Sequence, residues 1–181
     1  MKVLVAYSSR HGATKGIAGH IAKTLADEQL DVALRSVADV ESVDDYDAFV
    51  IGSSVYMFHW EKDATAFVRK HPGVLGSHPV WLFCSGPVGT ELIDKQGKDV
   101  LESARPKEFE EFLELIHPRG AQVFFGVYDP MREGATIAER LVARIPAIRE
   151  ALPAGDFRDW PVIEAWARKI ARELKPVPVA V

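Results

Sequence analysis

Short continuous apolar runs alternate along the chain with stretches in which apolar residues recur every third or fourth position. The continuous runs are typical of strands that are covered on both faces, and the recurring pattern is typical of helices that bury one face. The expected strands are KVLVAYS (2–8), DVALRSV (31–37), YDAFVIGSS (46–54), PVWLFCSGP (79–87) and AQVFFGVYDP (121–130). One helix is expected from Thr14 onward, and others over 61–71, 105–118, 136–152 and 159–174.

The alternation of strands and helices predicts an α/β fold, a three-layer sandwich with helices on both faces of a parallel sheet. Five strands favour the order 2-1-3-4-5, with an added helical segment before the last helix. Ligands of such sheets bind beyond the carboxyl ends of the strands, at the point where the strand order reverses. Three loops are expected there: Ser8 to Thr14, Ser53 to Trp60 and Cys84 to Gly89.

The loop between the first strand and the first helix carries the strongest chemical signal. A helix start offers free backbone amides and the positive end of the helix dipole, which together favour a phosphate. The loop is neither a Walker loop, because Gly12 is followed by Ala13-Thr14-Lys15, nor a G-x-G-x-x-G fingerprint. The remaining interpretations are a site for a single terminal phosphate and an ordinary capped helix start. The candidate phosphate residues are Ser8, Ser9, Arg10, His11, Gly12, Ala13 and Thr14.

The spacing Ser8-x-x-x-Gly12-x-Thr14, directly after the first strand, resembles the FMN phosphate loop of the flavodoxin family. The resemblance implies a flavodoxin-like fold with FMN as the cofactor. It also implies that the loop after the third strand lies against the flavin ring, where Tyr56 is the best candidate for an aromatic contact. Small residues after the fourth strand let the backbone approach the flavin edge. The implied ring-side residues are Ser53, Ser54, Val55, Tyr56, Cys84, Ser85, Gly86, Pro87, Val88 and Gly89.

Two further segments narrow the resemblance. VIGSSVYMFHWEKDATAFVRKH (50–71) and GDFRDWPVIEAWARKIA (155–171) are similar to the branch of the family that includes menaquinone-dependent protoporphyrinogen oxidase. That branch also carries a segment with its own helix between the fifth strand and the last helix, here from Pro130 to Asp159. The segment is interpreted either as a helix packed on the domain or as a lid that contacts an acidic substrate or a membrane-borne quinone.

Composition and charge bear on the domain organisation, the class of partner and the kinds of site that the chain can hold. The 181 residues are expected to form one domain over 1–175 with a loose tail over 176–181. A net charge of -4 argues against a nucleic-acid partner. The single cysteine, Cys84, excludes an internal disulfide and fits a reducing cytoplasm. No run is long enough for a transmembrane span. The six histidines show no metal-ligand spacing, so no metal site is expected, and no residue stands out as catalytic.

Three functions are compatible with these observations. The first is an FMN-dependent oxidoreductase of the protoporphyrinogen-oxidase-like type, which passes electrons to a quinone or another acceptor. The second is a flavodoxin-type electron carrier, and the third is an FMN-binding regulatory or interaction domain. The modest charge argues mildly against a carrier, because carriers dock through strongly charged faces. The partner is accordingly a quinone, a porphyrin-like small molecule or a redox protein, and peripheral membrane contact and oligomeric state are left open.

Overall fold

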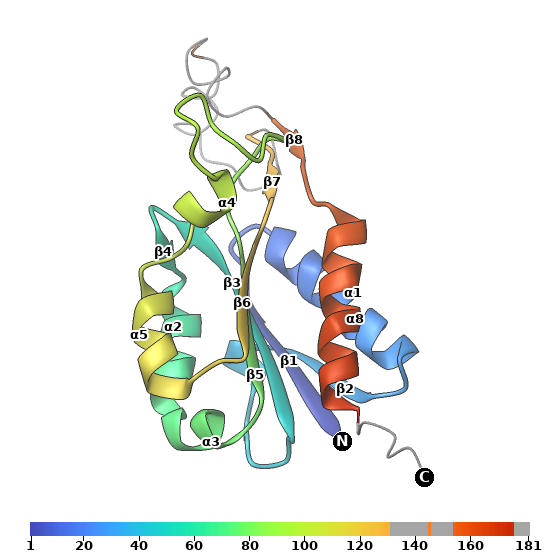
Figure 1. Cartoon of the computed structure of the whole chain (residues 1–181). Coiled ribbons are helices and arrows are strands. Elements are labelled where there is room, and N and C mark those ends of the chain that lie inside the picture. The colour runs from blue at the N-terminus through green and yellow to red at the C-terminus, as the bar shows by residue number, and fades with distance from the viewer. Residues whose placement is uncertain (131–144, 146–153, 176–181) are drawn as a thin grey trace.

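A parallel sheet forms the centre of the molecule. The computed structural model describes residues 1–130, 145 and 154–175 (Figure 1). The strands lie in the order β2-β1-β3-β5-β6, with the short β4 paired antiparallel to β3. Since β5 and β6 are the fourth and fifth parallel strands along the chain, the predicted order 2-1-3-4-5 is confirmed. The parallel strands are β1 (Lys2–Ser8), β2 (Asp31–Ser36), β3 (Ala48–Tyr56), β5 (Val80–Ser85) and β6 (Gly120–Phe124).

Helices cover both faces of this sheet (Figure 1). The long helices α1 (Ala13–Asp27) and α8 (Trp160–Leu174) pack side by side on one face. The opposite face carries α2 (Lys62–Lys70), α3 (Pro72–Ser77) and α5 (Glu108–Ile116). The three-layer α/β architecture is therefore confirmed. Two short helical elements are also present among the described residues: η1 (Val37–Asp39) and α4 (Val100–Ser103).

Residues 48–51 of β3 and 80–84 of β5 are apolar because each face of the sheet has its own core. Successive residues of β3 show the division: Phe49 and Ile51 pack toward α2 and α5, whereas Ala48 and Val50 pack toward α1 and α8. All four are fully buried. Burial of each large apolar side chain contributes about 1.5–3 kcal/mol. The strands are thus held firmly in place, and their carboxyl ends fix where the following loops begin.

The ends of the helices follow local chemistry. Asp159 caps α8 as predicted, since its Oδ1 accepts a hydrogen bond from the Val162 amide at 3.1 Å. The helix expected over 105–118 begins only at Glu108. No helix of the described residues is both long and apolar enough to cross a membrane.

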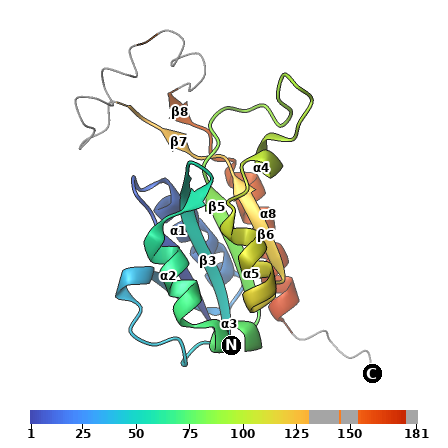
Figure 2. The ribbon, with the colours of Figure 1, turned by 90° about the vertical axis from the view of Figure 1, so that its left-hand side faces the viewer.

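The last predicted strand is shorter than expected. The run 121–130 leaves the sheet after Phe124 because the Gly126 amide turns away and donates a hydrogen bond to the Pro87 carbonyl at 2.8 Å. The chain then forms β7 (Val127–Tyr128), which pairs antiparallel with β8 (Gly155–Asp156) in a separate two-stranded sheet. Figure 2 shows this pair at the same end of the molecule as the loops that follow β3 and β5. The helix expected over 136–152, apart from residue 145, and the tail 176–181 lie outside the described residues.

The structure also contains a tight hairpin after β3 that the sequence does not predict. After β3 the chain reverses over two residues into β4 (His59–Trp60), and both turn residues have left-handed backbones: φ is 50° at Met57 and 64° at Phe58. A positive φ at both central residues is the requirement of a type I′ turn, which usually takes Asn and Gly. The sequence holds neither at these positions, so the usual hairpin signal is missing.

Candidate functional site

The loop between β1 and α1 leads into a helix N-terminus whose chemistry suits an anion. Gly12 is the N-cap of α1 and has φ 87°, a backbone that suits glycine. Its amide donates to Ser9 Oγ at 3.1 Å, which closes the loop in front of the helix. The first turn of α1 contains no acidic residue that would repel an anion. The free amides of this turn and the helix dipole therefore point to a phosphate.

A buried pair of hydroxyls joins this loop to the one after β5. Thr14 Oγ1 lies 2.8 Å from Ser85 Oγ, and both residues are buried. Either hydroxyl can be the donor, so one of the two protons is not used within the pair. That proton is available to an oxygen of a ligand. The pair thus fixes the spacing of two loops and adds a donor to the amides of α1.

The three predicted loops enclose one small cavity of about 100 Å³. This volume suits a phosphate group and is too small for a whole flavin nucleotide. The hydroxyls and backbone amides around it are donors that fit the terminal phosphate of FMN. The lining residues are Ser9, Arg10, His11, Ala13, Thr14, Ser54, Val55, Ser85, Gly86, Gly126 and Val127.

Several predicted site residues lie outside this lining. Ser8 is the last residue of β1, and Pro87, Val88 and Gly89 follow Gly86 along the third loop. Cys84 is fully buried in β5, and this burial raises the pKa of its thiol above the ordinary value. A thiol that stays protonated has little nucleophilic character, which agrees with a packing role.

Ser53 and Ser54 both form hydrogen bonds with Glu61, the residue that directly precedes α2. Ser53 is fully buried, and its Oγ accepts a hydrogen bond from the Glu61 amide at 3.0 Å. Ser54 Oγ donates to Glu61 Oε1 at 3.1 Å. The carboxylate of Glu61 in turn pairs with Arg10, whose Nε lies 3.1 Å from Oε1. Glu61 thereby connects the phosphate loop to the end of β3.

Tyr56 is placed where a flat ligand can meet it. Its side chain is 60% exposed, and the Arg10 guanidinium carbon lies 4.8 Å from the centre of its ring. Trp60 is different: it is buried and packs edge-on against Phe109 and Phe112, each at 5.4 Å between ring centres. Of these two aromatic residues, Tyr56 thus remains the candidate for contact with a ring.

The hairpin that carries Tyr56 is fastened to the start of α5. Glu108 Oε1 lies 2.8 Å from His59 Nδ1, and Glu108 Oε2 accepts a hydrogen bond from the Trp60 amide at 3.1 Å. The Lys107 amide donates to the Phe58 carbonyl at 3.0 Å. Three contacts therefore hold a turn whose own residues have an unfavourable backbone.

A second and much larger cleft, of about 1090 Å³, lies between this hairpin and α2. Arg10 lines both this cleft and the small cavity, so the two spaces meet at its side chain. The cleft is of a size that accommodates a small organic molecule. Its lining is Arg10, Tyr56, Met57, His59, Trp60, Glu61, Lys62, Asp63, Thr65, Ala66, Arg69, Lys70 and Glu108.

Four residues of this region were missed by the sequence analysis. Gly126 and Val127 line the small cavity from beyond the carboxyl end of β6. The rule that ligands bind at the carboxyl ends of strands could have identified them. Glu61 and Glu108 belong to no motif, and their roles depend on which loops the fold brings together. Within residues 1–130 and 154–175, no group of three or more His, Cys, Asp or Glu side chains is placed to hold a metal ion.

Solved structures with this architecture are flavodoxins and a larger oxidoreductase. A mutant flavodoxin from Pseudomonas aeruginosa has a TM-score of 0.59 at 16% identity, over 97% of this chain and 100% of that one. An archaeal flavodoxin has a TM-score of 0.58 at 18% identity, with the same coverage. The rubredoxin oxygen:oxidoreductase of Desulfovibrio gigas has a TM-score of 0.60 at 16% identity, over 96% of this chain and 36% of that one. These likenesses establish the fold.

Among characterised relatives, the chain is similar to protoporphyrinogen IX dehydrogenase [quinone] of Escherichia coli strain K12. The two sequences are 33% identical over 81 residues, which are 44% of this chain and 45% of the relative. The match thus spans less than half the length of the relative. The family model of the flavodoxin domain matches a larger part of this chain, residues 4–132. On this evidence the chain belongs to the flavodoxin family, with FMN as its cofactor.

Proposed function

We propose that the protein is an FMN-dependent oxidoreductase that oxidises a small organic donor, such as a porphyrin-like molecule, and passes electrons to a quinone or another small acceptor. The observation that carries the proposal is the cleft of about 1090 Å³ that adjoins the phosphate cavity at Arg10. It offers a second molecule a place next to the cofactor. The partial similarity to a quinone-linked dehydrogenase supports the same interpretation.

In this proposal the phosphate of FMN lies in the loop Ser8 to Thr14. Ser9, Thr14 and the first amides of α1 hold it, and the flavin ring lies against the loops Ser53 to Tyr56 and Cys84 to Gly89. The bound flavin supplies the redox chemistry. The protein's part is to bind and orient it: the buried Thr14–Ser85 pair fixes the loop spacing, and Tyr56 offers an aromatic face.

The test is reoxidation of the reduced protein without oxygen. The FMN-loaded protein is photoreduced and mixed either with menadione, a two-electron acceptor, or with cytochrome c, a one-electron protein acceptor. We expect menadione to reoxidise the flavin with a rate that saturates, because it binds in the cleft. Failure of menadione to react, with fast reoxidation by cytochrome c, would contradict the proposal.

A matched pair of variants locates the acceptor. Ala66 lines the cleft and is exposed on α2, so Ala66→Trp narrows the cleft without entering the core. We expect slower reoxidation by menadione and unchanged FMN affinity. Ala26→Trp makes the same change on an exposed position of α1, outside the cleft, and should alter neither.

An electron carrier is the second candidate. It is favoured by the solved flavodoxins, which this chain matches over their full length. In that case cytochrome c, or another redox protein, would reoxidise the flavin faster than menadione does, and Ala66→Trp would leave both rates unchanged.

A further inference from the structure

Arg10 lies between the two spaces of the site and is held by one carboxylate. Its Nε lies 3.1 Å from Glu61 Oε1, and its Nη2 donates to Glu61 Oε2 at 3.2 Å, an arrangement in which both carboxylate oxygens are engaged. The guanidinium carbon stacks 4.8 Å from the centre of the Tyr56 ring. Arg10 therefore faces the aromatic side of the site, although it belongs to the loop that receives the phosphate.

Glu61 is fixed more firmly than the arginine it holds. Its carboxylate accepts a hydrogen bond from Ser54 Oγ, and its own amide donates to the buried Ser53 Oγ. The side chain of Glu61 is 18% exposed, against 46% for Arg10. Since the carboxylate is anchored to β3, the guanidinium takes its position from Glu61 and not the reverse.

This arrangement has a chemical consequence for an anion in the neighbouring cavity. A phosphate monoester carries a charge of about −1.5 to −2 at neutral pH, and an arginine next to it would ordinarily bind it bidentately. Glu61 occupies the Nε and Nη2 donors of Arg10 and adds a negative charge beside the cavity. The carboxylate thus competes with the phosphate for one guanidinium.

We propose that Glu61 is a positioning residue: it holds Arg10 over Tyr56, on the flavin-ring side of the site, and withholds it from the phosphate. The protein gives up phosphate affinity and keeps a cation at the wall between cofactor cavity and cleft. This inference rests on the proposed phosphate site in the loop Ser8 to Thr14.

The first experiment replaces the carboxylate with its neutral isostere. In Glu61→Gln the amide oxygen still accepts from Ser54, but the charge that holds Arg10 is gone. We expect FMN to bind roughly two- to five-fold more tightly at low salt, since the freed guanidinium is partly exposed. The gain should disappear at about 1 M salt, where such interactions are screened. Riboflavin, which lacks the phosphate, should gain nothing.

Two controls separate positioning from structural support. Glu173→Gln removes the same charge from an exposed position on α8 and should leave FMN affinity unchanged. In an Arg10→Gln background, Glu61→Gln should give no gain, because the arginine that carries it is absent. The midpoint potential of bound FMN should shift to a more positive value in Glu61→Gln, since a negative charge beside the reduced flavin has been removed.

Opposite results overturn the proposal. Equal weakening of FMN and riboflavin in Glu61→Gln would reduce Glu61 to a support for Ser53 and Ser54, and unchanged binding of both would also contradict the competition. If Glu61→Gln does not fold, Arg10→Gln decides. The proposal requires it to affect FMN and riboflavin by the same factor, and a selective loss of FMN would place Arg10 on the phosphate already.

The phosphate site is tested separately. Unchanged FMN affinity in a variant that lacks both Ser9 and Thr14 hydroxyls would refute the location of the phosphate. That outcome is independent of the charge at Glu61, so the failure of one proposal is not mistaken for the failure of the other.

Discussion

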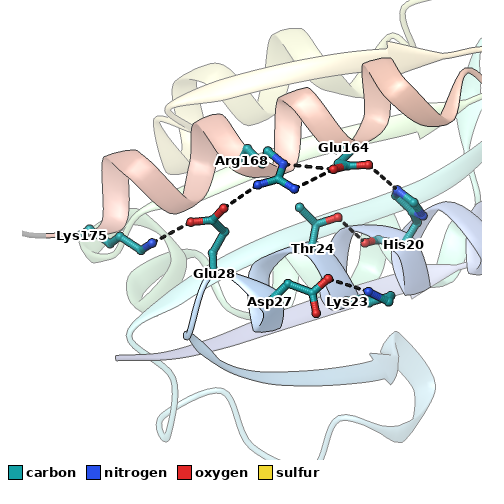
Figure 3. Close-up of polar contacts among 8 residues, drawn as sticks. All are labelled: His20, Lys23, Thr24, Asp27, Glu28, Glu164, Arg168 and Lys175. Atoms are coloured by element: carbon teal, nitrogen blue, oxygen red, sulfur yellow. Dashed lines mark hydrogen bonds and ion pairs between the residues drawn. The ribbon is translucent and has the colours of Figure 1, made fainter.

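Two clusters of arginine and carboxylate side chains in this molecule use the same chemistry for different purposes. One lies along the seam between α1 and α8, where Arg168 Nη1 donates to Glu28 Oε1 at 2.8 Å and Lys175 Nζ donates to Glu28 Oε2 at 2.7 Å (Figure 3). Glu164 and His20 extend this chain of contacts. The other is the Arg10–Glu61 pair with Ser54 and Tyr56 around it.

The two clusters differ in whether apolar packing already joins the segments that carry the charged side chains. At the seam, an apolar layer that includes Ile21, Leu25, Ala167 and Ile170 already joins the two helices, and the ion pairs lie on the solvent side. At the site, hydrogen bonds through Glu61 connect the loop that carries Arg10 to the end of β3. A surface ion pair therefore adds little to a seam already closed by packing, whereas a pair that joins a loop to a strand end sets where a functional side chain lies.

The largest effect is expected at the two hydroxyls that are proposed to hold the FMN phosphate. Ser9→Ala together with Thr14→Val should weaken FMN binding by about 1.5–3 kcal/mol for each hydrogen bond lost to the charged phosphate. Isothermal titration with FMN measures the loss. Thr24→Val is the matched control, because Thr24 is also buried on α1 but its hydroxyl bonds to the His20 carbonyl of its own helix. It should bind FMN as the original chain does.

The second-largest effect is expected from the contacts that hold the β3–β4 hairpin against α5. Glu108→Ala removes the acceptor of the Trp60 amide and the partner of His59, so it should lower the free energy of unfolding by about 1–3 kcal/mol, the cost of an unpaired buried donor. Urea denaturation measures this change. Glu114→Ala, at an exposed position of the same helix, should change stability very little. Equal effects of the two substitutions would show that Glu108 does not hold the hairpin.

A smaller and opposite effect is expected at the turn itself. Met57→Asn with Phe58→Gly supplies the residues that tolerate positive φ, and it should raise the free energy of unfolding by about 1 kcal/mol. Thermal unfolding monitored by circular dichroism measures it. A lower melting temperature would mean that the exposed Met57 and Phe58 side chains make contacts worth more than the backbone strain.

The smallest effect is expected at the seam. The hydrogen bond from Lys175, followed by its charge, holds the pKa of Glu28 below the ordinary value of 4.5. A carboxylate with a lowered pKa stabilises the fold above its unfolded pKa, and this contribution is lost as the pH falls through the folded pKa. Glu28→Gln should therefore lower the melting temperature slightly at pH 7 and not at all in strong acid. A loss as large as that of Glu108→Ala would show that the ion pairs, and not only the apolar packing, hold the seam together.

Much of this molecule could be predicted from the sequence. The apolar runs of β1, β3 and β5 and the cap at Asp159 depend on neighbours in the chain, so periodicity and capping rules found them. The phosphate loop was found for the same reason, since its hydroxyls, Gly12 and the helix start are contiguous. The cavity shows that this loop lies beside the carboxyl ends of β3 and β5, whereas the phosphate it should hold stays a prediction.

The rest depends on contacts between distant segments. The type I′ turn lacks the residues that announce it, because Lys107 and Glu108, which follows Trp60 by 48 residues, hold it from outside. Glu61 carries no signal of its own, since a glutamate before a helix is ordinary until Arg10 is brought beside it. The end of β6 was misplaced because the Gly126 amide bonds to Pro87 and not to a neighbouring strand.

The burial of Cys84 makes this chain convenient for spectroscopy. The only thiol in the sequence is fully buried in β5, where burial raises its pKa and shields it from labelling reagents. A cysteine introduced at Met57, which is 73% exposed at the tip of the hairpin, would therefore be modified alone, without first removing a native residue from the core. A fluorophore at that position would report on the wall of the cleft in an otherwise unaltered protein.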